Sequence, residues 1–161
     1  MIQLWNSGTT AVNGSSNEIY VSIFDEYQDK DNIQYKPIIT LTSHITGKAV
    51  TLLPSSYSYT NKERYVELKI LNKTSGSQSL AVGKVLLGNT DFPYGFYDVT
   101  IREAINASLP TDPAVLNSRH VVYTGLANLV PTTTGSFANP AVTYTEYTTN
   151  DSDTESVYIT N

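Results

Sequence analysis

The chain has 161 residues, a net charge of −5 and a hydrophobic fraction of 40%, enough for one domain, or one domain with an extension, to bury a core. Only 16% of its residues are charged, below the roughly 25% of an average soluble domain, and threonine, serine and asparagine supply much of the remaining polarity. Beyond Arg119 the chain carries acidic residues but no lysine or arginine, so we do not expect a basic patch for nucleic acid or an anionic membrane.

The sequence contains no cysteine, and we expect neither a signal peptide nor a membrane-spanning helix. The chain has no cysteine, which excludes a disulfide framework and thiolate chemistry. Residues 1–5 lack the basic start and the apolar run of a signal peptide. No stretch approaches the ~18 apolar residues that a membrane-spanning helix needs.

The first part of the chain combines an apolar patch with the first predicted strand. The patch consists of Ile2, Leu4 and Trp5, and a polar connector containing glycine follows it. Residues 18–24 alternate between apolar and polar side chains, a pattern that places one set on a buried face and predicts a β-strand. Residues 25–32 form an acidic, hydrated run.

The next part of the chain predicts a hairpin and a further strand. Strands are expected at 38–43 and 48–53, and the link between them, 45–47, ends in a glycine that suits a tight turn. Residues 54–61 are expected to form a loop. Residues 65–71 alternate again and predict a strand.

The middle of the chain alternates between connectors and strands. We expect a strand at 80–87, and 95–103 is the clearest strand pattern in the chain. The segment 104–118 carries two prolines, so it should form a loop, with at most one helical turn after Asp112.

The last part of the chain contains three weaker strand patterns. A strand is expected at 121–130, interrupted at Gly125. Residues 131–140 are rich in Thr, Gly and Pro and are expected to form a linker, and strands are expected near 141–148 and 156–160.

Together these patterns predict an all-β fold, an antiparallel β-sandwich that is either immunoglobulin-like or a jelly-roll. Residues 119–161 could complete the sandwich or form an arm that pairs with a neighbouring molecule, and the linker favours the arm. We divide the chain into a sandwich domain, 1–130, and a linker with C-terminal strands, 131–161.

The sequence offers little that resembles catalytic machinery. Its two histidines, His44 and His120, lie in or beside predicted strands, and there is no Gly-x-Ser-x-Gly nucleophile motif. We expect both histidines to be structural and the protein not to be an enzyme.

Carboxylates cluster in the acidic run and near the C-terminus. Alternate acids can bind Ca²⁺ through hard oxygen ligands, but neither run has the glycine and terminal glutamate of an EF-hand loop. Solvated loops are therefore the favoured interpretation, with no metal and no cofactor expected. The residues that could bind Ca²⁺ are Asp29, Asp31, Asp151 and Asp153.

The twelve tyrosines are the more suggestive feature. Tyrosine offers apolar area with a polar tip, which suits protein interfaces, although sheets also favour it for packing alone. The residues that we expect to contact a partner come from the two ends of the chain: Ile2, Leu4, Trp5, Tyr144, Tyr147, Val157, Tyr158 and Ile159.

Three strand patterns in this order, 18–26, 61–70 and 95–103, resemble small virion proteins of tailed bacteriophages, especially marine and crAss-like phages. The Tyr-Thr-Glu-Tyr motif at 144–147 and the segment 150–161 are also similar to the C-terminal part of such proteins. The resemblance covers about two-thirds of the chain and implies an auxiliary, decoration or cement protein on a shell of major capsid protein. It implies no active-site residues, a place in the virion, and assembly in the host bacterial cytoplasm.

The leading hypothesis is a non-enzymatic capsid decoration protein, present in many copies or as a homo-oligomer, that binds major capsid protein or other virion proteins. It would attach through sheet edges and tyrosine-rich faces, since an extended arm can add a strand to an open sheet. The alternative is a carbohydrate-binding or adhesin module of a head or tail fibre. In that case Tyr57, Tyr59, Phe92 and Tyr94 would present stacking aromatics, with Ca²⁺ at Asp29 and Asp31.

Overall fold

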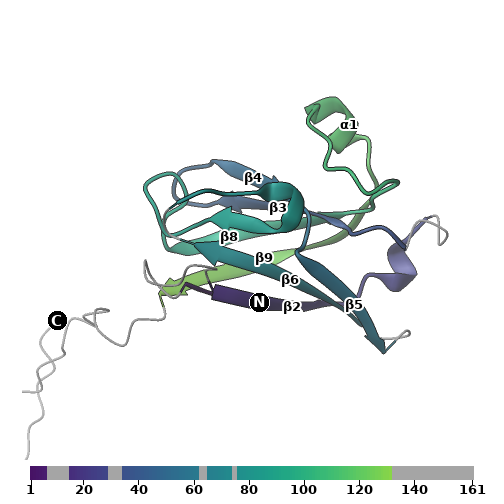
Figure 1. Ribbon diagram of the computed structural model, residues 1–161, viewed down its shortest axis with the longest axis horizontal. Coiled ribbons are helices and arrows are strands. Elements are labelled where there is room, and N and C mark those ends of the chain that lie inside the picture. Colours follow the sequence, from purple (N-terminus) through teal and green to yellow (C-terminus); the bar gives the residue numbers. More distant parts are fainter. Residues whose placement is uncertain (7–14, 29–33, 62–64, 74–75, 132–161) are drawn as a thin grey trace, which may run out of the picture.

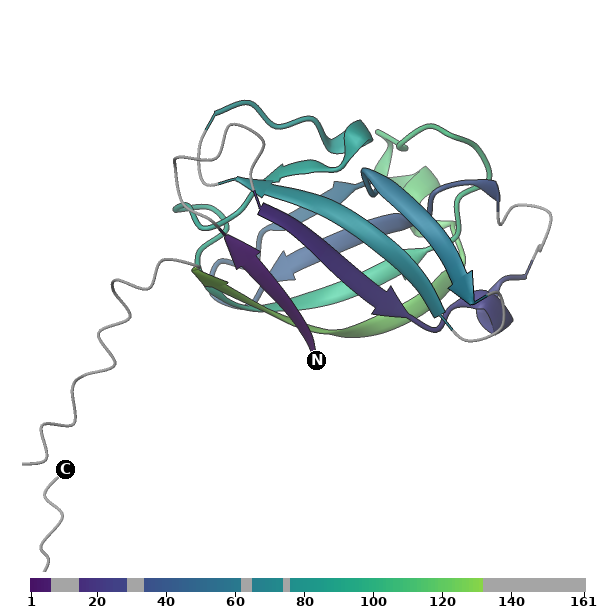
Figure 2. The same ribbon diagram turned by 60° about the horizontal axis from the view of Figure 1, so that its bottom comes forward.

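A computed structural model of the chain shows two β-sheets packed face to face (Figures 1 and 2). It describes residues 1–6, 15–28, 34–61, 65–73 and 76–131. The all-β sandwich that the alternating strand patterns predict is confirmed.

The described elements include short 3-10 helices (η) as well as strands and one α-helix. In chain order they are β1 (Ile2–Asn6), β2 (Ser15–Val21), η1 (Phe24–Glu26), β3 (Ile38–Ser43), β4 (Ala49–Leu52), β5 (Ser56–Asn61), β6 (Tyr65–Lys73), η3 (Leu80–Val82), β7 (Lys84–Leu86), β8 (Gly95–Arg102), α1 (Pro113–Asn117) and β9 (Val121–Pro131).

The strand order is that of an immunoglobulin-like sandwich. The five-stranded sheet, which we call sheet A, has the order β1-β9-β8-β3-β4, and sheet B has the order β2-β6-β5. In immunoglobulin lettering these are G-F-C-C′, with β1 added beside G, and B-E-D. The short strand β7 pairs with β6 in parallel, next to β5, and β1 pairs with β9 in parallel. Of the two sandwich types that the sequence allowed, the topology selects the immunoglobulin-like one.

The core lies between the two sheets and follows from the alternation of each strand. In β6, every second residue from Val66 to Asn72 is buried and the residues between them are only partly covered. A second, smaller core forms on the outer side of sheet A, where Ile38, Leu53 and Ala104 pack with Leu109 and Leu116. The segment 104–118, which includes α1 and projects from the sandwich in Figure 1, thus covers one end of sheet A.

A tyrosine corner fixes the start of β8. Tyr97 is fully buried, and its hydroxyl donates a hydrogen bond to the carbonyl of Pro93, four residues earlier, at 2.5 Å. This contact, near the start of strand F, is a recurring feature of immunoglobulin-like sandwiches. Burial raises the pKa of Tyr97 to about 12, which keeps its hydroxyl protonated as a donor.

Two buried asparagines tie β1 to sheet B. The Asn17 side chain accepts from the Trp5 backbone N–H at 2.5 Å and donates to the Trp5 carbonyl at 3.0 Å. Asn72 also donates to that carbonyl at 3.3 Å, and both asparagines are at least 98% buried. These side-chain hydrogen bonds therefore take the place of the backbone hydrogen bonds that a neighbouring strand would form with β1. Figure 2 shows β1 at the side of the sandwich, between β2 and β9.

Several local predictions are confirmed. The hairpin between β3 and β4 turns at 45–47, where Gly47 has a φ of 68° that favours glycine. The helix α1 is a single short helix after Asp112, whose side chain caps it by accepting from the Ala114 N–H at 2.8 Å.

Other predictions are wrong, each for a local reason. Residues 54–61 were expected to form a loop, but β5 lies there because Tyr57 pairs opposite Leu68 and packs against the core. Only the end of 80–87 is a strand, since η3 and Gly83, with a φ of 74°, precede β7.

The expected interruption of β9 at Gly125 is also wrong. Gly125 pairs with Val99 in an unbroken strand, and the irregularity lies instead between Ile101 and Arg102. Because β9 pairs with both β1 and β8, residues 121–131 complete the sandwich rather than forming an arm. The predicted strands at 141–148 and 156–160 lie outside the described residues.

Candidate interaction surface

The outer face of sheet A carries little charge and several exposed apolar side chains. Strand alternation directs these side chains away from the core, and we call the surface that they form the sheet A face. Its members from β1, β9, β8 and β3 are Gln3, Trp5, Thr124, Leu126, Asn128, Val130, Phe96, Asp98, Thr100, Arg102, Thr40 and Thr42.

Large apolar side chains gather at one end of this face. Trp5, Phe96 and Leu126 are 44%, 49% and 44% exposed, well above what core residues show. Trp5 pairs directly with Val130, and Phe96 lies opposite Asn128, which separates Leu126 from Val130 along β9. Diagonal neighbours across a sheet are within reach of aromatic side chains. We call Trp5, Phe96, Leu126 and Val130 the apolar patch.

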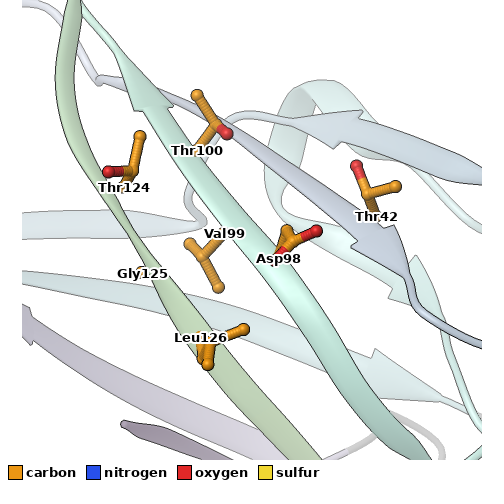
Figure 3. A pocket seen from close by; sticks show the side chains of 7 residues that line it. All are labelled: Thr42, Asp98, Val99, Thr100, Thr124, Gly125 and Leu126. Atoms are coloured by element: carbon orange, nitrogen blue, oxygen red, sulfur yellow. The ribbon is translucent and has the colours of Figure 1, made fainter.

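A shallow, open depression lies beside the patch (Figure 3). Its floor is the cross-strand pair Val99 and Gly125, since the Val99 side chain is buried and glycine has none. Side chains from three strands surround the floor, and the residues that do so are Thr42, Asp98, Thr100, Thr124 and Leu126. Three members of the ring are threonines, one is the carboxylate of Asp98 and one is Leu126, so the depression is open and largely polar at its rim.

The charges on the sheet A face are few, and one of them, Asp98, lies directly opposite Leu126 of the apolar patch. Asp98 lies 2.9 Å from the Nε2 of His44, so its carboxylate has a hydrogen-bonding partner on the neighbouring strand end. Arg102 lies at the far end of β8, where Ile38 opposite it belongs to the smaller core. The centre of the face thus combines threonines and apolar groups with the carboxylate of Asp98.

The outer face of sheet B is different in kind. Lys69 and Glu18 form an ion pair at 3.1 Å, and Tyr20 donates from its hydroxyl to Glu18 at 3.0 Å while its ring packs edge-on against Tyr65. The hydrogen bond from Lys69 holds the pKa of Glu18 below its usual value, and the bond to Glu18 raises the pKa of Tyr20. This surface is charged, hydrated and internally paired.

The edge of sheet B formed by β5 has only part of the usual protection against further pairing. Among the described residues β5 pairs only with β6, which leaves the outer side of its backbone towards solvent. Natural edge strands are often blunted by lysine, other charges, proline or a β-bulge. Residues 56–61 contain no charged residue and no proline, but their pairing with β6 shifts register between Ser58 and Asn61. The regularly paired part of this edge, 56–58, can therefore accept an added strand.

The residues predicted to contact a partner at the N-terminus are separated by the structure. Leu4 is fully buried in the core and Ile2 packs against it, because both point inward from β1. Trp5 points outward and belongs to the apolar patch. The predicted C-terminal contacts lie outside the described residues: Tyr144, Tyr147, Val157, Tyr158 and Ile159.

The predicted Ca²⁺ ligands also lie outside the described residues: Asp29, Asp31, Asp151 and Asp153. Within the part of the chain that the structure describes, no three His, Cys, Asp or Glu side chains come together in a way that could hold a metal ion. Over the same residues, no helix is both long and apolar enough to cross a membrane.

The aromatic residues of the carbohydrate-binding alternative are not brought together. Tyr57 donates to the carbonyl of Gln34, which lies just before β3. Phe92 and Tyr94 lie near the β3–β4 turn, where Thr46 donates to the Asp91 carbonyl at 2.7 Å. The two groups therefore lie at opposite ends of β3, and all three rings pack partly against the core. The side chain of Tyr59 is outside the described residues.

Phe96 and Leu126 are members of the surface that sequence reasoning did not single out. Each occupies a polar position of its strand pattern, and two apolar residues on the solvent side of neighbouring strands were the available signal.

Comparison of the chain with family models, with curated proteins and with solved structures gives no match.

Proposed function

We propose that this chain is a non-enzymatic structural protein of a tailed-phage particle that decorates or cements the capsid surface. Its partners are the major capsid protein or other virion proteins. The observation that carries the proposal is the exterior of the sandwich, which combines the exposed apolar patch with the open β5 edge. Exposed apolar groups on a charge-poor surface are typical of protein–protein contact sites.

Strand addition is the proposed mode of attachment to the shell. A partner segment that pairs with β5 would form backbone hydrogen bonds along its open side, and alternate side chains would set the register. The predicted strands at 141–148 and 156–160 would act in the reverse role. There this chain would supply the strand that is added to the open sheet edge of a neighbouring protein.

Weak individual contacts are sufficient on a particle. A shell presents many copies of one site in a fixed array, so contacts of modest affinity act together once several are made. A decoration protein therefore needs accessible, adhesive surfaces rather than one deep pocket, and the sheet A face and β5 edge are such surfaces.

The test is attachment to shells. Purified full-length chain should co-sediment with shells of the phage that encodes it, prepared without this protein, and antibody labelling should locate it on mature particles. A variant that ends at residue 140 should remain in the supernatant, because it lacks the segment 141–161. A control variant, Lys73→Ser, alters the outer face of sheet B and should attach like the parent.

Two results would overturn the proposal. One is the absence of the protein from mature particles. The other is saturable binding to a glycan array that depends on Ca²⁺, which would favour the adhesin alternative.

A further inference from the structure

We propose that residues 132–145 of this chain, which lie outside the described residues, bind across the apolar patch of the same molecule. The inference goes beyond attachment to a capsid, because it assigns an occupant to this surface in the free protein. It rests on where β9 ends, on the composition of the segment and on the charges that follow it.

The described chain leaves the sandwich at the apolar patch. β9 ends at Pro131, and the residue before it, Val130, belongs to the patch and pairs with Trp5 (Figure 2). The patch member farthest back along β9 is Leu126, roughly 14 Å from Val130. Fully extended, residues 132–145 reach about 46 Å. The segment is therefore long enough to turn and lie across every member of the patch.

The segment carries apolar side chains and no charge. Its large apolar side chains come from Phe137, Val142 and Tyr144, and it stops before the first acidic residue of the C-terminal part. Asp98 lies opposite Leu126, so an occupant with carboxylates of its own would be repelled there. A segment of threonine, tyrosine and apolar residues avoids this repulsion, and its hydroxyls can donate hydrogen bonds to the Asp98 carboxylate.

The charges beyond the segment match the far end of the sheet A face. Residues 146–155 are acidic and contain no lysine or arginine. Arg102 lies roughly 20 Å from Phe96 along β8, and Arg119 comes two residues before Val121, the cross-strand neighbour of Arg102. Both arginines are partly exposed, no described carboxylate pairs with either, and the Nε of each is buried without a hydrogen-bond partner. A chain that covers the patch and continues along the face thus carries its acids towards two unpaired cations.

The size of the patch favours an occupant from the same chain. Trp5, Phe96 and Leu126 are 44–49% exposed and together offer roughly 300 Å². Separate proteins that associate stably bury about 600 Å² or more on each partner. A covalent link of this length gives the segment an effective concentration on the order of 1 mM at the patch. A contact too weak to hold a second molecule is therefore sufficient within one chain.

The experiment uses Trp5, the single tryptophan, as a probe of the patch in the full-length chain. A variant that combines Phe137→Ser, Val142→Ser and Tyr144→Ser keeps the sandwich unchanged. Its Trp5 fluorescence should be quenched by acrylamide with a constant about twofold higher than in the parent, since a cover present half of the time then leaves the patch.

The matched control combines Val157→Ser and Ile159→Ser, which remove apolar side chains beyond the acidic part and should leave quenching as in the parent. Leu126→Asp alters the patch itself, at a side chain that is already 44% exposed, and should also raise the constant. In that background the three serine substitutions should have no further effect, because the contact is already lost.

Equal quenching in the parent and the triple serine variant would refute the proposal. A constant that falls as the chain concentration rises from roughly 1 to 100 µM would refute it as well, because a second molecule would then be the occupant. Neither result bears on co-sedimentation with shells, so this contact and the virion role can fail separately.

Discussion

The two outer faces of this sandwich differ, although the inner faces are built alike. Both sheets bury every second residue of their strands, mostly Val, Leu and Ile. On the outside, sheet B presents the Glu18–Lys69 ion pair and the edge-on contact of Tyr20 with Tyr65. Sheet A presents mostly threonines together with Trp5, Phe96 and Leu126, with one exposed contact between Asp98 and His44.

The difference indicates which face can take part in binding. Exposed ion pairs contribute little to stability but hold water strongly, so a partner would have to remove that water from sheet B. Apolar side chains release water favourably when they are covered, and a threonine hydroxyl does so at low cost where the partner offers a hydrogen bond. The two outer faces of the sandwich thus differ in chemistry. Substitutions in the shared core should destabilise both sheets, whereas substitutions on one outer face should leave the fold intact.

The largest effect is expected at the asparagine contact that joins the two sheets. Asn17→Ala leaves the Trp5 N–H without this partner and leaves the Trp5 C=O with the longer bond from Asn72, which should lower the free energy of unfolding by about 2–3 kcal/mol. Urea unfolding measures this loss. Trp5 is the single tryptophan, so its fluorescence should report release of β1 at a lower urea concentration than circular dichroism of the sheets.

The control for this variant is Gln3→Ala, an exposed residue of the same strand, which should leave both transitions in place. Coincident transitions in Asn17→Ala at the parent's midpoint would show that β1 does not depend on this contact.

A smaller effect, confined to sheet A, is expected at Gly125. A Cβ there would lie 2.8 Å from Cζ of Tyr123, so the ring would have to move from its place against the core. Gly125→Ala should therefore lower the free energy of unfolding by about 1–3 kcal/mol. In the background of Tyr123→Ala the same substitution should cost much less, and a double-mutant cycle by urea unfolding measures that coupling. Equal costs in both backgrounds would contradict this explanation.

The hydrogen bond of the tyrosine corner should contribute about as much to the free energy of unfolding as Gly125→Ala removes, and its contribution should depend on pH. Tyr97→Phe removes the hydrogen bond to Pro93 and should cost about 1–2 kcal/mol at pH 7. Burial raises the pKa of Tyr97 to about 12, above the roughly 10 of an unfolded tyrosine. Between these values the unfolded chain ionises first, so stability is full below pH 10 and falls towards pH 12.

The measurement is thermal or urea unfolding of both proteins from pH 8 to 12. Because Tyr97→Phe lacks this titration, the advantage of the parent should shrink as the pH rises above about 10. A constant difference across the range would be inconsistent with an elevated Tyr97 pKa.

The sequence predicted best those elements that are determined by residues close together in the chain. Alternation located β3 exactly and β8 within one residue, because burial of one face repeats every second position. Asp112 and the following proline predicted α1, since a cap acts on adjacent residues. In contrast, β5 was missed because its serine–tyrosine run resembles a loop until β6 pairs with it.

The surface was harder to predict because it depends on strand order. Trp5 was singled out as an apolar residue near the terminus, but its inward neighbour Leu4 could not be told apart from it without the register of β1. Phe96 and Leu126 are thirty positions apart in the chain, and only the pairing of β8 with β9 makes them neighbours.

The smallest effect is expected on sheet B and tests the comparison directly. The hydrogen bond from Lys69 lowers the pKa of Glu18, so any stabilisation is present above the ordinary carboxyl pKa and is lost as the pH falls through the lowered value. Because the pair is exposed, Glu18→Gln should leave the urea midpoint at pH 7 unchanged within error, in low and in high salt. A lower urea midpoint for Glu18→Gln at pH 7 would contradict this expectation, because it would show that the exposed pair stabilises the fold.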